Sequence, residues 1–396
     1  MSVALTPKVT WVGKVDWELV RFHGDEYSTH HGSSYNAYLV RDQKSVLIDT
    51  VWQPFASEFV QNLKKTVDLQ EIDAIVCNHA EIDHSGALNE LMLEIPDTPI
   101  YCTANGVKIL RGHYHQDWNF VTVKTGDTLE IGESKLVFLE APMLHWPDTM
   151  FTYLTGENIL FSNDGFGQHY ASEMLYNDCV SQGELFQEAI KYYANILTPF
   201  SSQVTKKINE VLALNLPLSM ICPSHGIIWR DNPAQIIEKY LAWASAYKEN
   251  QITLVYDSMW GSTRKMAEAI TRGITRTDPD VTVKLLNIAR EDKNDAICEI
   301  FKSKAILVGS STINNGLLFS VGGLLEMIHG LKFKDKYAAA FGSYGWSGEA
   351  VKKIGSLLQN AGFTLVNEGI RTLWVPDVDA DLACENFGEA FAKAVV

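Results

Sequence analysis

The segment with the clearest chemical potential is residues 79–84, His-Ala-Glu-Ile-Asp-His. It places four side chains that can bind a metal within six positions, directly after a β-like apolar run at 73–78. A solvated loop rarely concentrates imidazoles and carboxylates in this way, so the segment predicts metal binding. His79, Glu81 and Asp83 alternate along the chain, and an extended or turning backbone directs alternate side chains to one side.

Three later residues share the setting of this cluster, because each lies where an apolar run gives way to a loop with Gly or Pro nearby. Taken alone, His145 suits a structural histidine and Asp164 a turn former. Strand ends on one edge of a sandwich converge in space, however, and the 79–84 cluster makes all three residues, His145, Asp164 and His225, credible ligands. The predicted metal-binding set is His79, Glu81, Asp83, His145, Asp164 and His225.

This donor set contains three imidazoles and three carboxylates. If Asp164 bridges two metals, each metal receives nitrogen and oxygen donors and keeps open positions. Such a carboxylate-rich, thiolate-free set stabilises the higher charge of Fe(III) and is typical of di-iron chemistry. Zinc has no redox step, so Glu81 favours iron without deciding the matter.

A second set of chemically suggestive residues begins at 257–270, Asp-Ser-Met-Trp-Gly-Ser-Thr followed by a helical pattern. Ser258, Gly261, Ser262 and Thr263 would place hydroxyl and backbone N–H groups around a phosphate at a helix N-terminus. Ordinary helix capping accounts for the same residues. The segment lacks the Gly-Lys-Ser/Thr ending of a nucleotide P-loop.

Two further Gly/Ser-rich loops, 310–316 and 342–348, follow later apolar runs of the same half. Trp260 and Trp346 stand among glycines, where a flat ring is suited to cover a flavin. No dinucleotide fingerprint with a following acid is present, so the mononucleotide FMN is the expected ligand. The predicted FMN-binding residues are Ser258, Met259, Trp260, Gly261, Ser262, Thr263, Ser311, Thr312, Ile313, Asn314, Asn315, Gly316, Ser343, Tyr344, Gly345, Trp346, Ser347 and Gly348.

The elements that position these residues differ between the two halves of the chain. The first half is a β-rich α/β sequence with hairpin patterns at 37–51 and 149–164. The second half alternates strands and helices, which is typical of a doubly wound parallel sheet. Its predicted strands are 252–258, 281–288, 304–311, 337–344 and 363–369. The polar stretch 247–251 is the candidate linker, and we expect domains at 1–249 and 250–396.

Composition and net charge limit which binding partners and which cellular compartment are expected. The net charge of −15 argues against nucleic acid and anionic membranes, which reward basic residues. No apolar run approaches the roughly 20 residues of a membrane span, and the first residues do not resemble a signal peptide. The six scattered cysteines contain no Cys-x-x-Cys, which excludes a zinc ribbon or a rubredoxin-type site on this chain. We therefore expect a cytoplasmic protein.

Together the motifs resemble those of the flavodiiron proteins, over essentially the whole chain. The matching segments are HAEIDH, MLHWPD, SNDGFGQ, YYANI and PSHG, with DSMWGSTRKMA and AFGSYGWSGEA in the second half. The resemblance implies a metallo-β-lactamase-like αββα sandwich followed by a flavodoxin-like doubly wound parallel sheet. It also implies two irons, FMN, and reduction of O2 to water or of NO to N2O, a pair of substrates between which the sequence does not choose.

The resemblance also assigns roles to single residues. It implies that His79, Glu81 and His145 hold one iron, that Asp83 and His225 hold the other, and that Asp164 bridges them. His84 is expected outside the coordination sphere. His23 and Tyr193 are the expected donors of hydrogen bonds or protons to the bound gas. Tyr192 and Tyr193 point about 100° apart on a helix, so at most one of them serves this role well.

Electron counting agrees with this interpretation, because two ferrous ions and a reduced flavin hold the four electrons that O2 reduction needs. The family's rubredoxin module does not occur in this sequence, which leaves open whether the protein lacks it or the sequence is a piece of a longer chain. The resemblance implies rubredoxin or its reductase as the external electron donor in either case. The resemblance further implies a homodimer, sometimes doubled to a homotetramer, in which the FMN of one subunit faces the irons of the other.

Three other interpretations stay open. One is a zinc-dependent hydrolase fused to a flavodoxin-like domain. The second is a flavin electron carrier whose first half is a structural metal module. The third is a gas reductase that takes its electrons from a reduced deazaflavin.

Overall fold

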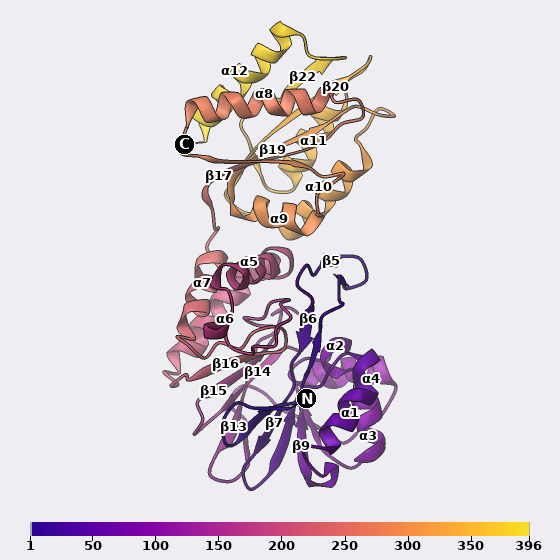
Figure 1. Ribbon diagram of the computed structural model, residues 1–396, viewed down its shortest axis with the longest axis vertical. Helices are drawn as coiled ribbons and strands as arrows, with labels where there is room; N and C mark the ends of the chain where they lie inside the picture. The colour runs from indigo at the N-terminus through magenta and orange to yellow at the C-terminus, as the bar shows by residue number, and fades with distance from the viewer. Residues whose placement is uncertain (1, 396) are drawn as a thin grey trace. The chain divides into compact units, whose positions relative to one another are not determined.

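The computed structural model describes residues 2–395, which form two compact units (Figure 1). One unit contains the residues up to Tyr193 together with Phe200–Leu241. The other contains Ala194–Pro199 and the chain from Ala242 onward. The domain limits of 1–249 and 250–396 stay a prediction.

The first unit is built on two large β-sheets. The seven-stranded sheet has the order β1 (Val3–Ala4), β2 (Val9–Trp11), β7 (Tyr38–Arg41), β8 (Ser45–Ile48), β9 (Ile72–Val76), β10 (Ile100–Cys102) and β11 (Phe120–Thr122). The five-stranded sheet has the order β12 (Thr128–Glu130), β13 (Lys135–Glu140), β14 (Met150–Leu154), β15 (Ile159–Asn163) and β16 (Met220–Pro223). Two short pairs, β3 (Lys14–Asp16) with β6 (Ser33–Tyr35) and β4 (Arg21–Phe22) with β5 (Tyr27–Ser28), complete it.

Alternating apolar side chains from the two sheets meet in one core. Tyr38 packs on Phe161 with ring centroids 5.1 Å apart, and Tyr101 stacks on Phe138 at 5.9 Å. This is the packing that two-residue periodicity produces when each sheet buries one face. Both predicted hairpins are confirmed, since β7 pairs with β8 and β14 pairs with β15, antiparallel in each case.

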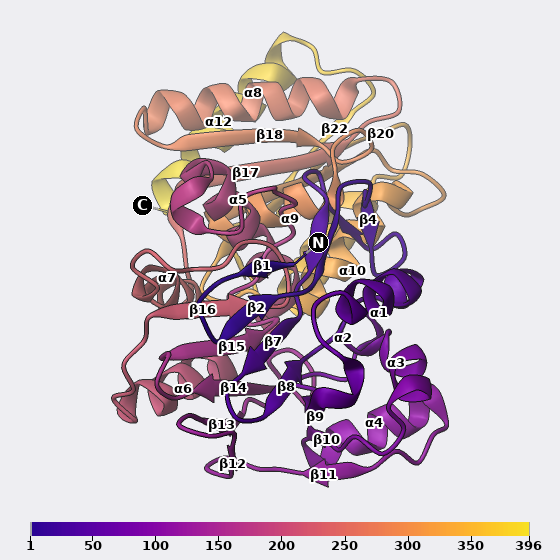
Figure 2. The ribbon, with the colours of Figure 1, turned by 60° about the horizontal axis from the view of Figure 1, so that its bottom comes forward.

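Helices cover the outer faces of this sandwich (Figures 1 and 2). Helix α1 buries Ala56, Phe59, Val60 and Leu63, a spacing that places one apolar stripe against the sheet. The helices beside the first sheet are α1 (Ala56–Lys64), α2 (Ile82–Ser85), α3 (Leu88–Glu94) and α4 (Ala104–Tyr114). Those beside the second sheet are α5 (Gln182–Tyr192), α6 (Ser201–Ala213) and α7 (Ala234–Ala244). The predicted αββα sandwich is confirmed.

The second unit contains a parallel sheet in the order β18-β17-β19-β20-β21, with β22 also paired to β20. Helices α8 and α12 pack on one face, where alternate strand residues such as Leu254, Leu307 and Phe341 form a core. Helices α9, α10 and α11 contact the same strands and cover the other face (Figure 1). The strands are β17 (Glu249–Asp257), β18 (Thr282–Asn287), β19 (Ser303–Ser310), β20 (Tyr337–Tyr344), β21 (Thr364–Leu365) and β22 (Ile370–Leu373). The helices are α8 (Ser262–Thr277), α9 (Lys293–Lys302), α10 (Phe319–Leu331), α11 (Ala350–Asn360) and α12 (Val378–Ala394).

Two predictions about this unit are wrong in detail. The run 363–369 contains only the two-residue strand β21, because the chain bends at 366–368 before β22 begins at Ile370. Gly369 ends that bend at φ +89°, and a Cβ there would lie 2.5 Å from the Ala340 carbonyl oxygen. The candidate linker 247–251 is largely strand, since β17 begins at Glu249 and the buried Gln251 amide reaches Ser303 Oγ at 3.1 Å.

The described part of the chain, residues 2–395, has no helix with both the length and the apolar character needed to cross a bilayer.

Candidate functional site

The 79–84 segment changes its backbone conformation in the middle. His79 follows strand β9, Glu81 is the N-terminal cap of α2, and Asp83 and His84 lie within that helix. A helical turn rotates successive side chains by about 100°, so Asp83 does not follow the direction of the two residues before it. His79 and Glu81 therefore join one group of potential ligands, and Asp83 joins a neighbouring group.

The consequence is two neighbouring groups of potential ligands instead of one. The first group is His79, Glu81, His145 and Asp164, and the second is Asp83, His84 and His225. Within each group the donor atoms lie within 4.8 Å of one another. Residues from four separate stretches of the chain thus meet at one edge of the sandwich, as predicted from their positions after apolar runs.

Asp164, directly after strand β15, lies between the two groups. Its Oδ2 is 3.6 Å from His79 Nε2 and 3.2 Å from His145 Nε2. Its Oδ1 is 2.9 Å from His84 Nε2 and 3.6 Å from His225 Nε2. Burial alone would raise the pKa of Asp164, but the surrounding imidazoles lower it well below its usual range. One carboxylate therefore presents one oxygen to each group, which is the arrangement of a bridging ligand.

The buried polar atoms of the two groups test whether a metal fits. Both carboxylate oxygens of Asp83, both ring nitrogens of His84 and Oδ2 of Asp164 are buried with no hydrogen bond of good geometry among residues 2–395, although His84 Nε2 and His225 Nε2 lie 3.2 and 3.0 Å from Asp83 Oδ2. Each such atom costs about 1 to 3 kcal/mol unless something else binds it. Nitrogen and oxygen donors without a thiolate suit divalent iron or a similar cation. The residues fit a pair of metal ions. His84 Nε2 lies as close to the carboxylates of Asp83 and Asp164 as the predicted ligands do, so the exclusion of His84 from the coordination sphere stays a prediction.

Asp148, which supports the predicted ligand His79, was not predicted from the sequence. Asp148 places its two carboxylate oxygens 3.1 and 3.2 Å from His79 Nδ1, and its Oδ2 accepts the Ala80 N–H at 2.7 Å. Burial alone would raise the pKa of Asp148, but the bond from His79 lowers it. A carboxylate behind a histidine ligand fixes the ring and its tautomer. The signal was available, because Asp148 stands three residues after His145.

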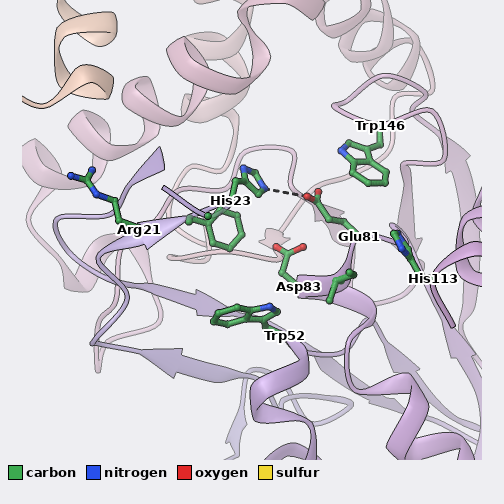
Figure 3. Close-up of a pocket in the computed structure, with 10 residues that line it drawn as sticks. Arg21, His23, Trp52, Glu81, Asp83, His113 and Trp146 are labelled. Carbon is green, nitrogen blue, oxygen red and sulfur yellow. Dashed lines mark ion pairs between the residues drawn. The ribbon is translucent and has the colours of Figure 1, made fainter. Parts of the chain in front are cut away.

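A cavity of about 340 Å³ opens beside Glu81 and Asp83. Figure 3 shows both carboxylates on its wall, with Trp52 and Trp146 on either side of them. His23, from the turn between β4 and β5, places its Nε2 3.1 Å from Glu81 Oε1 (Figure 3). Burial lowers the pKa of His23, but Glu81 outweighs burial and raises it. His23 therefore lies where the sequence predicts it, at the open face of the metal ligands.

The two tyrosines of the 192–193 pair face different surroundings. Tyr193 Oη lies 3.0 Å from Ser201 Oγ, and its ring packs edge-on against Tyr240. Tyr192 packs 5.4 Å from His169, and burial together with the carboxylates of Asp164, Asp83 and Glu81 raises its pKa. These surroundings favour Tyr192 over the predicted Tyr193 as the tyrosine nearer to the carboxylates of the site, and the role of either residue stays a prediction.

The second unit contains a cavity of about 660 Å³ at the carboxyl ends of its strands. All three predicted loops contribute to its lining, through Met259, Trp260, Ser262, Ser311, Thr312, Ile313, Asn314, Asn315, Ser343, Tyr344, Gly345, Trp346 and Ser347. Five predicted residues do not line it, namely Ser258, Gly261, Thr263, Gly316 and Gly348. Trp374 and Val375 also line it and were missed, although they follow strand β22 in the way that the other loops follow theirs.

Local geometry explains the loop at 258–263. Ser258 Oγ accepts the Gly261 N–H at 3.0 Å, and Gly261 adopts φ +87° before helix α8. The hydroxyl of Thr263 lies 3.0 Å from Ser311 Oγ and 2.9 Å from Ser343 Oγ, which ties the three loops together. A helix N-terminus beside several hydroxyls fits a phosphate. Trp260 and Trp346, 92% and 89% exposed, provide flat rings at the cavity and complete a fit to FMN.

Comparison with known proteins agrees with both sites. The model of the ODP family of β-lactamases matches residues 34–226, and the flavodoxin model matches residues 254–391. The chain is 56% identical over 395 residues to the anaerobic nitric oxide reductase flavorubredoxin of Klebsiella pneumoniae, covering 99% of this chain and 82% of that protein. The chain belongs to the flavodiiron protein family.

Solved structures of other flavodiiron proteins have the same fold. Rubredoxin oxygen:oxidoreductase from Desulfovibrio gigas superposes with a TM-score of 0.96 at 35% identity, over 100% of this chain and 98% of that one. The flavodiiron protein from Giardia intestinalis gives 0.95 at 33% identity, over 100% and 97%. The predicted fold class is confirmed, and in this flavodiiron protein the lactamase-like match contains all six predicted metal ligands.

Proposed function

We propose that this flavodiiron protein is an oxidoreductase that reduces O2 to water, NO to N2O, or both, at a di-iron centre supplied with electrons through FMN. The observation that carries the proposal is the position of Asp164, whose two oxygens face two separate groups of nitrogen and oxygen donors. A mixed, carboxylate-rich set of this kind is suited to iron that changes its oxidation state.

The proposed ligands follow this division. His79, Glu81 and His145 hold one iron, Asp83 and His225 hold the other, and Asp164 bridges them. When bound, two ferrous ions and reduced FMN supply the four electrons that O2 needs, or the two that convert two NO to N2O.

The side chains that line the cavity beside Glu81 and Asp83 make it suitable for a diatomic gas. Trp52, Trp146 and Phe22 line it with apolar rings, which limit the water beside the metal ligands. His23 Nε2 and the Tyr192 hydroxyl are the proposed donors of hydrogen bonds and protons, because both face the carboxylates of the site.

The proposed FMN site is the larger cavity, with the phosphate at the N-terminus of α8 and the flavin ring beside Trp260 and Trp346. Its residues are those predicted from the three loops, joined by Trp374 and Val375. The proposal keeps domain limits of 1–249 and 250–396, a boundary that falls in the gap between the two family matches.

Three further points belong to the proposal. Rubredoxin or its reductase is the external electron donor, in keeping with the names of the relatives. The protein is a homodimer or a homotetramer, which would cover apolar rings as exposed as Trp260 and Trp346. Its location is the cytoplasm, since five of its six free cysteines are buried thiols of the kind kept in a reducing compartment.

Anaerobic stopped-flow spectroscopy tests the reaction. Protein loaded with iron and FMN is reduced fully and mixed with O2 or with NO, and the same protein without iron serves as the control. We expect one O2, or pairs of NO with release of N2O, to be consumed at the expense of the stored electrons. Loaded protein that consumes neither gas contradicts the proposal, and protein that retains zinc and cleaves an ester or amide favours the hydrolase.

A further inference from the structure

Two charged side chains are buried on helix α5, away from the metal ligands. Glu188 is 3% exposed and Lys191, one helical turn later, is 1% exposed. Glutamate and lysine are almost never buried to this extent unless their charges are paired. Glu188 Oε1 lies 3.1 Å from His31 Nδ1, whereas its Oε2 is buried with no hydrogen-bond partner in the described chain, 2–395.

These residues connect the protein surface with the wall of the metal centre. The His31 side chain is 42% exposed and forms the outer end of the connection. At the inner end, Lys191 Nζ donates to Ser28 Oγ at 2.9 Å and lies 5.7 Å from the centre of the Tyr27 ring.

Aromatic residues continue the connection inward. Tyr27 packs against His169 at 5.0 Å and against Tyr192 at 6.4 Å. The His169 ring lies 4.8 Å from that of His225, a proposed iron ligand. A column of polar and aromatic side chains therefore runs from the surface at His31 to the metal ligands.

The proposed reaction requires such a connection, because it consumes protons inside the protein. O2, four electrons and four protons give two water molecules, and two NO, two electrons and two protons give N2O and water. The cavity beside Glu81 is lined by Phe22, Trp52 and Trp146 together with titratable residues such as His23, and it contains none of the residues of this column. The column therefore offers protons a second approach to the centre, in addition to His23.

The electrostatic setting of Glu188 suits a group that takes up and releases a proton. Burial raises the pKa of Glu188, and the nearby positive charge on Lys191 offsets part of that effect. The other titratable groups that face Glu188 are His30 and His31, from the segment before β6, and Tyr170, from the loop that follows β15. A carboxyl group whose pKa is raised toward neutrality accepts protons from water more readily than an ordinary glutamate does.

We propose that His31, Glu188 and Lys191 form a proton-delivery route from solvent to Tyr192 at the di-iron centre. His31 Nδ1 gives a proton to Glu188 Oε1, Lys191 Nζ releases one of its own protons to the Ser28 hydroxyl, which passes a proton on towards Tyr27 and Tyr192, and Lys191 is then reprotonated from Glu188. Each group returns to its starting state once the proton has moved on, so the route supplies protons without consuming electrons. Glu188 does not touch the substrate in this scheme, and the inference rests on the proposed function.

The variant Glu188→Gln tests the route, because it keeps the size and hydrogen bonding of the side chain but cannot carry a proton as a carboxyl does. Glu184→Gln is the matched control, since Glu184 lies on the same helix one turn earlier, is exposed, and accepts from the Tyr170 hydroxyl at 2.8 Å. Gas consumption by the loaded, reduced protein is measured in H2O and in D2O across pH 6 to 9.

We expect Glu188→Gln to slow gas reduction on the order of 10- to 100-fold, to increase the solvent isotope effect, and to retain wild-type iron and FMN contents. Glu184→Gln is expected to behave as the wild type. If Glu188→Gln retains wild-type turnover and isotope effect, or if its slow turnover is explained by lost iron, the route is wrong.

Two further comparisons keep the test decisive. If Glu188→Gln does not fold, the variant His31→Asn tests the outer end of the route instead. A slower reaction and a larger solvent isotope effect are expected for it, and unchanged kinetics overturn the route. Wild-type protein that is fully loaded but consumes no gas contradicts the proposed function itself, and with it the route.

Discussion

Replacing Asp148 by Asn should weaken iron binding without changing the shape of the site. The Asp148 side chain is 1% exposed and accepts from two donors, His79 Nδ1 and the Ala80 N–H. Asn keeps the volume and one acceptor oxygen, but it loses the negative charge. Its amide group also turns N–H donors towards a position where two donors already converge.

The size of the effect follows from these contacts. A hydrogen bond to a charged group contributes about 1.5 to 3 kcal/mol, and a buried donor left without a partner costs about 1 to 3 kcal/mol. Water does not screen Asp148, so the full range applies. Loss of the residue that orients a metal-binding histidine typically lowers metal affinity about 10- to 100-fold. This corresponds to about 1.4 to 2.7 kcal/mol and agrees with the range from the contacts.

Anaerobic titration of metal-free protein with Fe(II), against a competing chelator, measures this affinity. Asp42→Asn is a suitable control, because the Asp42 carboxylate is also buried and accepts from Lys8 Nζ at 2.9 Å and Ser134 N at 3.0 Å. It lies at the turn between β7 and β8, so its loss should lower the stability of the protein and leave iron affinity unchanged. If Asp148→Asn binds iron as tightly as the wild type, or if Asp42→Asn weakens binding equally, the argument from orientation of His79 fails.

Three other predictions address the metal preference, the flavin and the packing. Glu81→His should shift the metal preference towards zinc and abolish gas reduction, as measured by metal content and gas consumption, and retained activity would contradict the assignment of iron to Glu81. Thr263→Val keeps the shape of a fully buried residue but removes the hydroxyl that joins the loops of the flavin cavity. Fluorescence titration should therefore show the affinity for FMN lowered about 10-fold, which corresponds to about 1.4 kcal/mol. Gly273→Ala should lower the free energy of unfolding by about 2 to 3 kcal/mol, because a Cβ at this position of α8 would lie 2.0 Å from the Glu385 carbonyl oxygen. Unchanged stability in urea denaturation would show that α8 and α12 have room to separate.

The sequence predicted the fold and most of the metal ligands because both depend on local patterns. Two-residue alternation marks the hairpins, strand–helix alternation marks the parallel sheet, and the residues that follow apolar runs meet at one edge of a sheet sandwich. Trp374 was missed because the strand before it, β22, was not itself predicted from the sequence.

Other features depend on backbone direction and tertiary contacts, which spacing does not reveal. Asp83 joins a different group of donors from Glu81 because α2 begins at Ile82, and a helix of four residues carries no periodic signal in the sequence. The choice between Tyr192 and Tyr193 depends on how the end of α5 is rotated against Ser201 and Tyr240. Asp148 stands close to His145 in the sequence, but its contact with His79 Nδ1 depends on the tertiary structure.

Mössbauer spectroscopy of protein reconstituted with iron-57, together with metal and flavin analysis, tests the central claim most directly. The account predicts two magnetically coupled irons and one FMN per chain, with ligands of nitrogen and oxygen only. A single uncoupled iron, or zinc in place of iron after anaerobic purification, would show that Asp164 and the five predicted ligands around it do not hold a di-iron centre.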